Sequence, residues 1–153
     1  MTEQQQCSNL PEVQLPSGDM LRNMWNSQVH FQSLLDDSFQ LFVSGNSSSV
    51  MGSHDFGDNP SITSEERAKR LSYNILALHA ELTETLEWLP WKNWKTYPAP
   101  FAHNDVVEAQ YEAIDCLHFL INIMALLGMT PEMVYDGFMR KQQENRNRQE
   151  RGY

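Results

Sequence analysis

The sequence is poor in cysteine, in basic residues and in long apolar runs, and each shortage excludes a class of protein. Its two cysteines, Cys7 and Cys116, are too few for a disulfide framework or a cysteine-rich zinc site. Eleven Lys and Arg against 20 Asp and Glu leave a formal net charge of −9, which disfavours binding to duplex nucleic acid. The longest apolar stretch, near residues 116–127, is interrupted by His118 and Asn122 and is too short to span a bilayer. We therefore expect a cytoplasmic protein with no nucleic-acid and no membrane partner.

The chain divides into a polar beginning and one domain. Residues 1–17 contain Pro11 and Pro16 and have no signal-peptide pattern, which predicts a flexible leader. Residues 18–153 are long enough for one hydrophobic core and are predicted to form a single domain. Within this domain, residues 44–61 are rich in Gly and Ser, which predicts a loop that is either a lid over a substrate or disordered.

Apolar residues recur at three- and four-residue steps in four stretches, which predicts helices near residues 17–41, 63–88, 104–127 and 130–148. Thr63 and Glu66 have the spacing of a capping box at the start of the second stretch. Gly128 suits the end of the third, and Thr130 before Pro131 suits the start of the fourth. No strand-like alternation is present, so the sequence predicts an all-α bundle of four to five helices.

Two pairs of carboxylates have the same spacing on consecutive predicted helices. Glu81 and Glu84 are three residues apart and share one face, and Glu112 and Asp115 repeat this arrangement on the next helix. Asp115 lies in a largely apolar helix, where an unpaired carboxylate is costly to bury unless it becomes protonated. A divalent cation removes that cost, and Mg²⁺ or Mn²⁺ prefers oxygen ligands. The pairs together predict a metal site, although a lone ExxE is more often a solvated helix face.

A polar row follows in the last predicted helix, where Lys141, Asn145 and Arg148 occur at steps of four and three. Such a row suits phosphate oxygens, because Arg offers a planar fork of donors and Lys a compact positive charge. The alternative is that these cations only complement the dipole at the helix C-terminus. Carboxylates for metal together with a row for phosphates would form the set needed to hydrolyse a phosphoanhydride.

These motifs resemble the all-α NTP pyrophosphatases, a family that includes the MazG-like enzymes and the dimeric dUTPases. The family core is an ExxE on one helix and an ExxD on the next, matched here by residues 81–84 and 112–115. The dUTPase branch has a WKxWK-like connector after the first motif, matched by residues 91–95, and continues the second motif with LHF, matched by residues 117–119. Its tail is similar to KNxxNxxRQxxGY, which residues 141–153 follow except at the second position.

The chain also departs from the dUTPase branch in two ways. It is shorter than the dimeric dUTPases, so we expect a homodimer or homotetramer in which a neighbouring subunit contributes site residues. The base-reading motif of that branch is similar to QxxLN, whereas residues 28–32 keep Gln28 and lack the Asn. Because hydrogen-bonding groups decide base identity, a purine-directed relative that resembles the phage MazG-like enzymes acting on dGTP stays open. A phage-encoded protein of this kind would work in the host cytoplasm.

The resemblance implies hydrolysis of a nucleoside triphosphate at its α-phosphorus, which releases the monophosphate and pyrophosphate. It implies two or three Mg²⁺ or Mn²⁺ ions held by four carboxylates, Glu81, Glu84, Glu112 and Asp115. One glutamate of the first pair would also accept the proton of the attacking water, and the phosphates would lie on Lys141, Asn145 and Arg148. The base would be bound by Gln28, Gln32 and Trp25, with His118 behind a metal-bound carboxylate. Trp25 and His118 also fit a core position.

An alternative from another class is a non-enzymatic helical module that dimerises or binds a partner. Trp88, Trp91 and Trp94 would then be interface anchors rather than walls of a site. A di-iron carboxylate bundle is disfavoured, because that class uses Glu-x-x-His ligand pairs and these two helices contain none.

Overall fold

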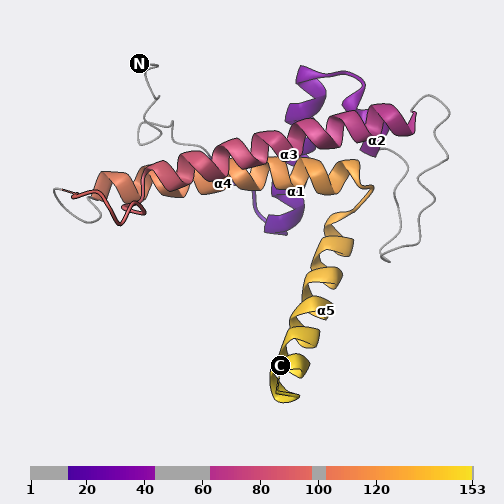
Figure 1. The fold of residues 1–153 in the computed structure, drawn as a ribbon. Helices are drawn as coiled ribbons and strands as arrows, with labels where there is room; N and C mark the ends of the chain where they lie inside the picture. The colour runs from indigo at the N-terminus through magenta and orange to yellow at the C-terminus, as the bar shows by residue number, and fades with distance from the viewer. Residues whose placement is uncertain (1–13, 44–62, 98–102, 153) are drawn as a thin grey trace.

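The described part of the chain is entirely helical apart from its connections, as Figure 1 shows for the computed structural model. The structure describes residues 14–43, 63–97 and 103–152, so most of the predicted leader, the predicted loop at 44–61 and Tyr153 lie outside it. The helices are α1 (Met20–Leu35), α2 (Phe39–Val43), α3 (Ser64–Glu87), α4 (His103–Leu126) and α5 (Pro131–Glu150). Since these ranges contain no strand, the predicted all-α class is confirmed.

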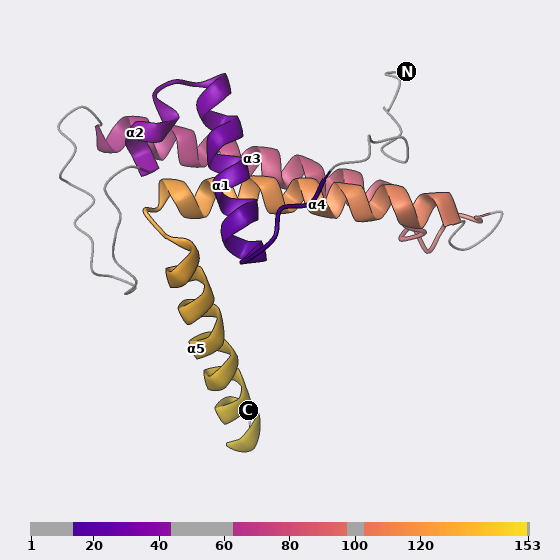
Figure 2. The ribbon, with the colours of Figure 1, turned by 180° about the vertical axis from the view of Figure 1, so that it is seen from behind.

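Helices α3 and α4 form a long antiparallel hairpin on which the other elements are placed (Figure 1). Helix α1 crosses this hairpin, and the short α2 packs near the C-terminal end of α4 (Figure 2). Because α3 and α4 run side by side along most of their length, equally spaced residues on their facing sides meet in pairs. This hairpin therefore decides which polar side chains come together.

The hydrophobic core lies where α1 and α2 cover the second half of α4. Trp25 of α1 packs against Ile121 and Ala125, and all three are at most 6% exposed. Phe39 and Phe42 of α2 form a second buried group with Leu126. Burying one large apolar side chain of this kind stabilises the fold by about 1.5–3 kcal/mol. These contacts hold α1 across the hairpin at a fixed position.

The structure confirms the predicted start of α3, the predicted end of α4 and the predicted start of α5. The hydroxyl of Thr63 accepts a 3.1 Å hydrogen bond from the Glu66 amide, and the Glu66 carboxylate accepts one of 2.9 Å from the Thr63 amide. Gly128 has a φ of 74°, in the left-handed region that favours glycine after a helix end. Thr130 caps α5 by accepting a 3.3 Å hydrogen bond from the amide of Met133.

The predicted first helix was too long, because α1 ends at Leu35 and α2 begins as a separate helix at Phe39. Asp36 causes the break: its Oδ1 accepts hydrogen bonds of 3.0 Å from the amide and 2.6 Å from the hydroxyl of Ser38. Its second carboxylate oxygen pairs with Arg70 of α3. Local side-chain hydrogen bonds of this type compete with helix formation, and apolar periodicity does not register them.

Helix α5 leaves the hairpin, with an angle of 104° between α4 and α5 (Figure 2). An ion pair between Arg22 and Glu132 ties its first turn to α1, whereas Tyr135 and Phe138 further along are largely exposed. Within the described ranges no single helix is long and apolar enough to cross a membrane; α4 and α5 reach that length and composition only as a bent pair.

Candidate functional site

Three of the four predicted metal ligands meet on the facing sides of α3 and α4. Glu81, Glu112 and Asp115 each present an oxygen atom, and these three atoms lie within 4.8 Å of one another. The antiparallel hairpin brings them together, because the three-residue spacing on each helix keeps a pair on one face. A compact set of carboxylate oxygens fits a hard divalent cation such as Mg²⁺ or Mn²⁺.

The charges around this cluster repel one another. Burial raises the pKa of Glu81, and the charges of Glu84, Asp115 and Glu112 raise it further. Burial likewise raises the pKa of Glu112, against the effect of the Trp88 indole, whose Nε1 donates a 3.4 Å hydrogen bond to Glu112 Oε1. Glu84 is outside the group of three oxygens, yet its charge acts on both glutamates. A bound cation would reverse the sign of these interactions and favour the ionised carboxylates.

A cavity of about 500 Å³ opens beside the carboxylates, with a lining from α1, α3 and α4: Ser27, Gln28, Phe31, Gln32, Glu81, Asp115, His118 and Phe119. The volume lies within the range typical of small-ligand sites. Gln28 and Gln32, predicted to bind a base, therefore share one cavity with two of the predicted metal ligands. This juxtaposition depends on α1 crossing the hairpin.

The other residues predicted for this region, His118 and Trp25, lie in different surroundings. His118 is a neighbour of the carboxylates, since its Nδ1 lies 3.2 Å from Asp115 Oδ1 and about half of its side chain is exposed. Trp25 instead packs in the core and is not part of the cavity lining. Gln28 is only 7% exposed, and its Nε2 donates a 3.0 Å hydrogen bond to Oδ1 of Asn122.

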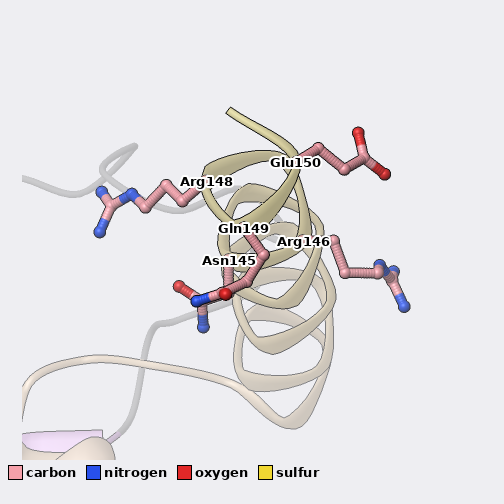
Figure 3. Close-up of a pocket in the computed structure, with 5 residues that line it drawn as sticks. All are labelled: Asn145, Arg146, Arg148, Gln149 and Glu150. Atoms are coloured by element: carbon pink, nitrogen blue, oxygen red, sulfur yellow. The ribbon is translucent and has the colours of Figure 1, made fainter. Parts of the chain in front are cut away.

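The predicted phosphate row lies elsewhere within this chain. Lys141, Asn145 and Arg148 are on α5, which points away from the α3–α4 hairpin (Figure 1). Figure 3 shows Asn145 and Arg148 on one side of α5 and Arg146 on the other, near the end of the helix. Arg148 Nε donates a 3.1 Å hydrogen bond to Glu144 on the same helix. Within one chain the carboxylates and glutamines therefore lie at the same cavity, whereas the predicted phosphate row lies on α5, away from that cavity.

Several residues of the site could not be predicted from the sequence. Asn122 was visible only as an interruption of an apolar run, and Asn74 had no distinguishing signal at all. Phe31 and Phe119 belong to ordinary apolar patterns, so their position in the cavity lining follows from how α1 and α4 pack. The sequence leaves Trp88 as an interface anchor or a site wall, whereas in the structure its indole donates a hydrogen bond to Glu112.

Residues 58–125 match the model of a protein family described as dUTPase. The match spans somewhat less than half of the chain and includes all of α3, the connector and nearly all of α4. It therefore contains all four carboxylates of the predicted metal site, together with Asn74 and Asn122. Comparisons with curated proteins and with solved structures gave no significant match.

Proposed function

We propose that this chain hydrolyses a deoxynucleoside triphosphate to the monophosphate and pyrophosphate, as its resemblance to the dimeric dUTPase branch of the all-α NTP pyrophosphatases implies. The match of residues 58–125 to a dUTPase family supports this proposal. One observation carries the proposal: a single cavity is lined by the base-reading candidates Gln28 and Gln32 and by the carboxylates Glu81 and Asp115. A pocket that joins hydrogen-bonding amides to a carboxylate cluster suits a ligand with a base at one end and phosphates at the other. Such an activity would control the nucleotide pool.

The carboxylates that would hold Mg²⁺ or Mn²⁺ are Glu81, Glu112 and Asp115, with Glu84 beside them. Two or three such ions are expected, and bound ions of this type supply Lewis acidity and activate water near neutral pH. Glu81 or Glu84 accepts the proton of the water that attacks the α-phosphorus. His118 lies against Asp115 and orients that carboxylate.

The base would enter the side of the cavity formed by α1. Gln28 and Gln32 supply hydrogen-bonding amides there, while Phe31 and Phe119 supply apolar faces in the same lining. Aromatic faces stack well on planar rings, whereas the amides distinguish the polar edge of one base from another. Trp25 contributes by holding α1 on α4 rather than by direct contact.

The phosphate row on α5 would complete the site of a neighbouring subunit. Since α5 projects from its own hairpin, its residues Lys141, Asn145 and Arg148 would be within reach of a second copy of the chain. Symmetric oligomers place equivalent surfaces on each other reciprocally, so both copies would gain a complete site. The proposed assembly is a homodimer or homotetramer.

For the preferred substrate we propose dUTP or dCTP, by likeness to the dUTPase branch. A purine-directed enzyme of the phage MazG-like type, acting on dGTP or GTP, is the second candidate. It is supported by residues 28–32, which keep Gln28 but lack the Asn of the dUTPase motif. Both candidates predict the same products and differ only in the base.

A panel of dUTP together with the eight common NTPs and dNTPs, with Mg²⁺ or Mn²⁺ and assayed for pyrophosphate and monophosphate, tests the proposal. Release of pyrophosphate from at least one nucleotide is expected. Orthophosphate as the sole inorganic product would contradict attack at the α-phosphorus. No release from any nucleotide would favour the non-enzymatic module, for which the exposed Trp91 and Trp94, in edge-to-face contact at 5.7 Å, are the anchors.

A further inference from the structure

Three amide side chains form a hydrogen-bonded relay from α3 through α4 to the cavity. Asn74 Nδ2 donates a 2.9 Å hydrogen bond to the main-chain carbonyl of Arg70. Asn122 Nδ2 donates one of 3.0 Å to Asn74 Oδ1, and Gln28 Nε2 donates one of 3.0 Å to Asn122 Oδ1. Asn122 is 1% exposed and Gln28 is 7% exposed, so the inner part of the relay is shielded from water.

The direction of this relay is determined at its outer end. A main-chain carbonyl can only accept a hydrogen bond, so Asn74 must turn its NH₂ group towards Arg70 and its oxygen towards Asn122. Asn122 must then offer its NH₂ group to Asn74 and its oxygen to Gln28. A reversal of any one amide would oppose two donors or two acceptors in a buried place, which is unfavourable.

The relay fixes the orientation of the Gln28 amide. With Nε2 engaged by Asn122, its Oε1 is the opposite end of the amide, and among the described residues it has no protein hydrogen-bond partner. Gln28 is also part of the cavity lining. An acceptor with this little exposure requires a donor from a ligand or from water.

We propose that Asn74 and Asn122 are positioning residues that hold Gln28 with its carbonyl oxygen as a fixed acceptor for the base. This inference rests on the proposed function and narrows its substrate class to nucleotides whose base carries a ring N–H. Uracil, thymine and guanine have such a donor next to a carbonyl group. Cytosine and adenine have an unprotonated ring nitrogen at the corresponding place, which would face Oε1 as a second acceptor.

The same relay thus accommodates dUTP and dGTP and disfavours dCTP and dATP. Among the pyrimidines and among the purines, a rigid acceptor disfavours the base that lacks the matching donor, because one buried polar atom is then left unpaired. A Gln28 amide that is free to rotate would lose this selectivity, since its NH₂ group could serve cytosine or adenine equally well.

The test compares kcat/KM for dUTP against dCTP and for dGTP against dATP, using the full chain with Mg²⁺. In each pair that is turned over, the ring N–H base is expected to be favoured by about tenfold or more. Asn122→Leu, which frees the Gln28 amide, is expected to bring the ratio close to one. Asn122→Asp is the matched control: its side chain still accepts from Gln28 Nε2 although it no longer donates to Asn74, so the ratio persists even if the Tm and the rate fall. Asn74→Ala, at a half-buried position, serves if Asn122→Leu does not fold.

Two results would overturn the inference. A preference for dCTP or dATP in the unaltered chain would contradict the fixed acceptor. An unchanged ratio of kcat/KM in a folded Asn122→Leu or Asn74→Ala variant with a lowered Tm would show that the relay stabilises the fold but does not select the base. If no nucleotide is hydrolysed, the proposed function fails, and calorimetry of dUMP against dCMP and of dGMP against dAMP then decides the inference. Equal binding within both pairs, or no binding, would reject it.

Discussion

Glu81 of α3 and Asp115 of α4 face each other across the hairpin, with carboxylate oxygens within 4.8 Å of each other. Glu112 belongs to the same group, so three negative charges converge in a partly buried place. Like charges at this distance destabilise a fold unless protons or cations compensate them. The hairpin is therefore destabilised by repulsion between these carboxylates, and a bound divalent cation would relieve it. The effect on stability and activity can be measured.

Asp115→Asn is expected to lower the rate of pyrophosphate release by about 100-fold or more, because loss of a partner behind a metal ligand already costs about 10- to 100-fold and Asp115 is a proposed ligand itself. The Tm of the metal-free variant should equal or exceed that of the unaltered protein, since one repelling charge is removed. Glu87→Gln, an exposed change at the end of the same hairpin, is the control and should keep its activity. A fully active Asp115→Asn protein would contradict the proposal that this carboxylate cluster takes part in hydrolysis.

Removal of metal is expected to abolish hydrolysis and to lower the Tm. A cation present at 100 times its Kd should stabilise the folded chain by about 2.7 kcal/mol. Thermal unfolding with EDTA, and then with Mg²⁺ or Mn²⁺ added back, measures this difference. Glu81→Gln should lose most of the shift; an equal shift in that variant would place the cation at another site.

The contribution of Glu81 to the stability of the metal-free protein should fall as pH rises above the usual Glu pKa of 4.5. Burial and neighbouring charges raise the pKa of Glu81 in the folded state, so the unfolded chain ionises first and is favoured as pH increases. Glu81→Gln cannot ionise, and its Tm advantage over the unaltered chain should therefore grow from pH 4.5 upward. A Tm difference that is constant with pH would contradict the raised pKa.

Asp36→Asn should weaken the junction between α1 and α2. The Arg70 guanidinium and the Ser38 hydroxyl lower the pKa of Asp36 from its usual 3.8 to about 2. Its ionised form therefore stabilises the fold above pH 3.8, and that contribution is lost as pH falls towards 2. Because about a third of each side chain in the pair is exposed, the loss should be only about 0.5–1 kcal/mol near neutral pH. Chemical unfolding at pH 7 and pH 2.5 measures it, and Asp37→Asn, at an exposed neighbouring position, is the control.

Mixing two inactive variants tests whether α5 serves a neighbouring subunit. Glu81→Gln lacks a metal ligand and Arg148→Ala lacks part of the phosphate row, so each homo-oligomer should be poorly active. In a mixed dimer one site combines the intact hairpin of one copy with the intact α5 of the other, and random exchange should restore about a quarter of the sites. No recovery after complete exchange, shown by native mass spectrometry, would mean that both groups act within one chain.

The local features were predictable because they depend on neighbours in the sequence. The caps at Thr63 and Thr130 and the turn at Gly128 follow from backbone groups that adjacent residues satisfy. The three-residue spacing of the carboxylates predicted that each pair shares a face, and the hairpin confirms that Glu81 meets Glu112 and Asp115. The break at Asp36 was missed, because its bond to Arg70 comes from another helix.

The helical class, the helix ends from α3 onward and the two carboxylate pairs could be predicted from the sequence, since they depend on periodicity and on contacts within a few residues. The way α1 crosses the hairpin could not be predicted, because it depends on packing between helices that are distant in the sequence. That crossing places Gln28 beside the carboxylates, buries Trp25 and links Gln28 to Asn122 and Asn74. The physical reason is that the amide relay joins residues from three helices, and its direction is set by one main-chain carbonyl that no residue pattern records.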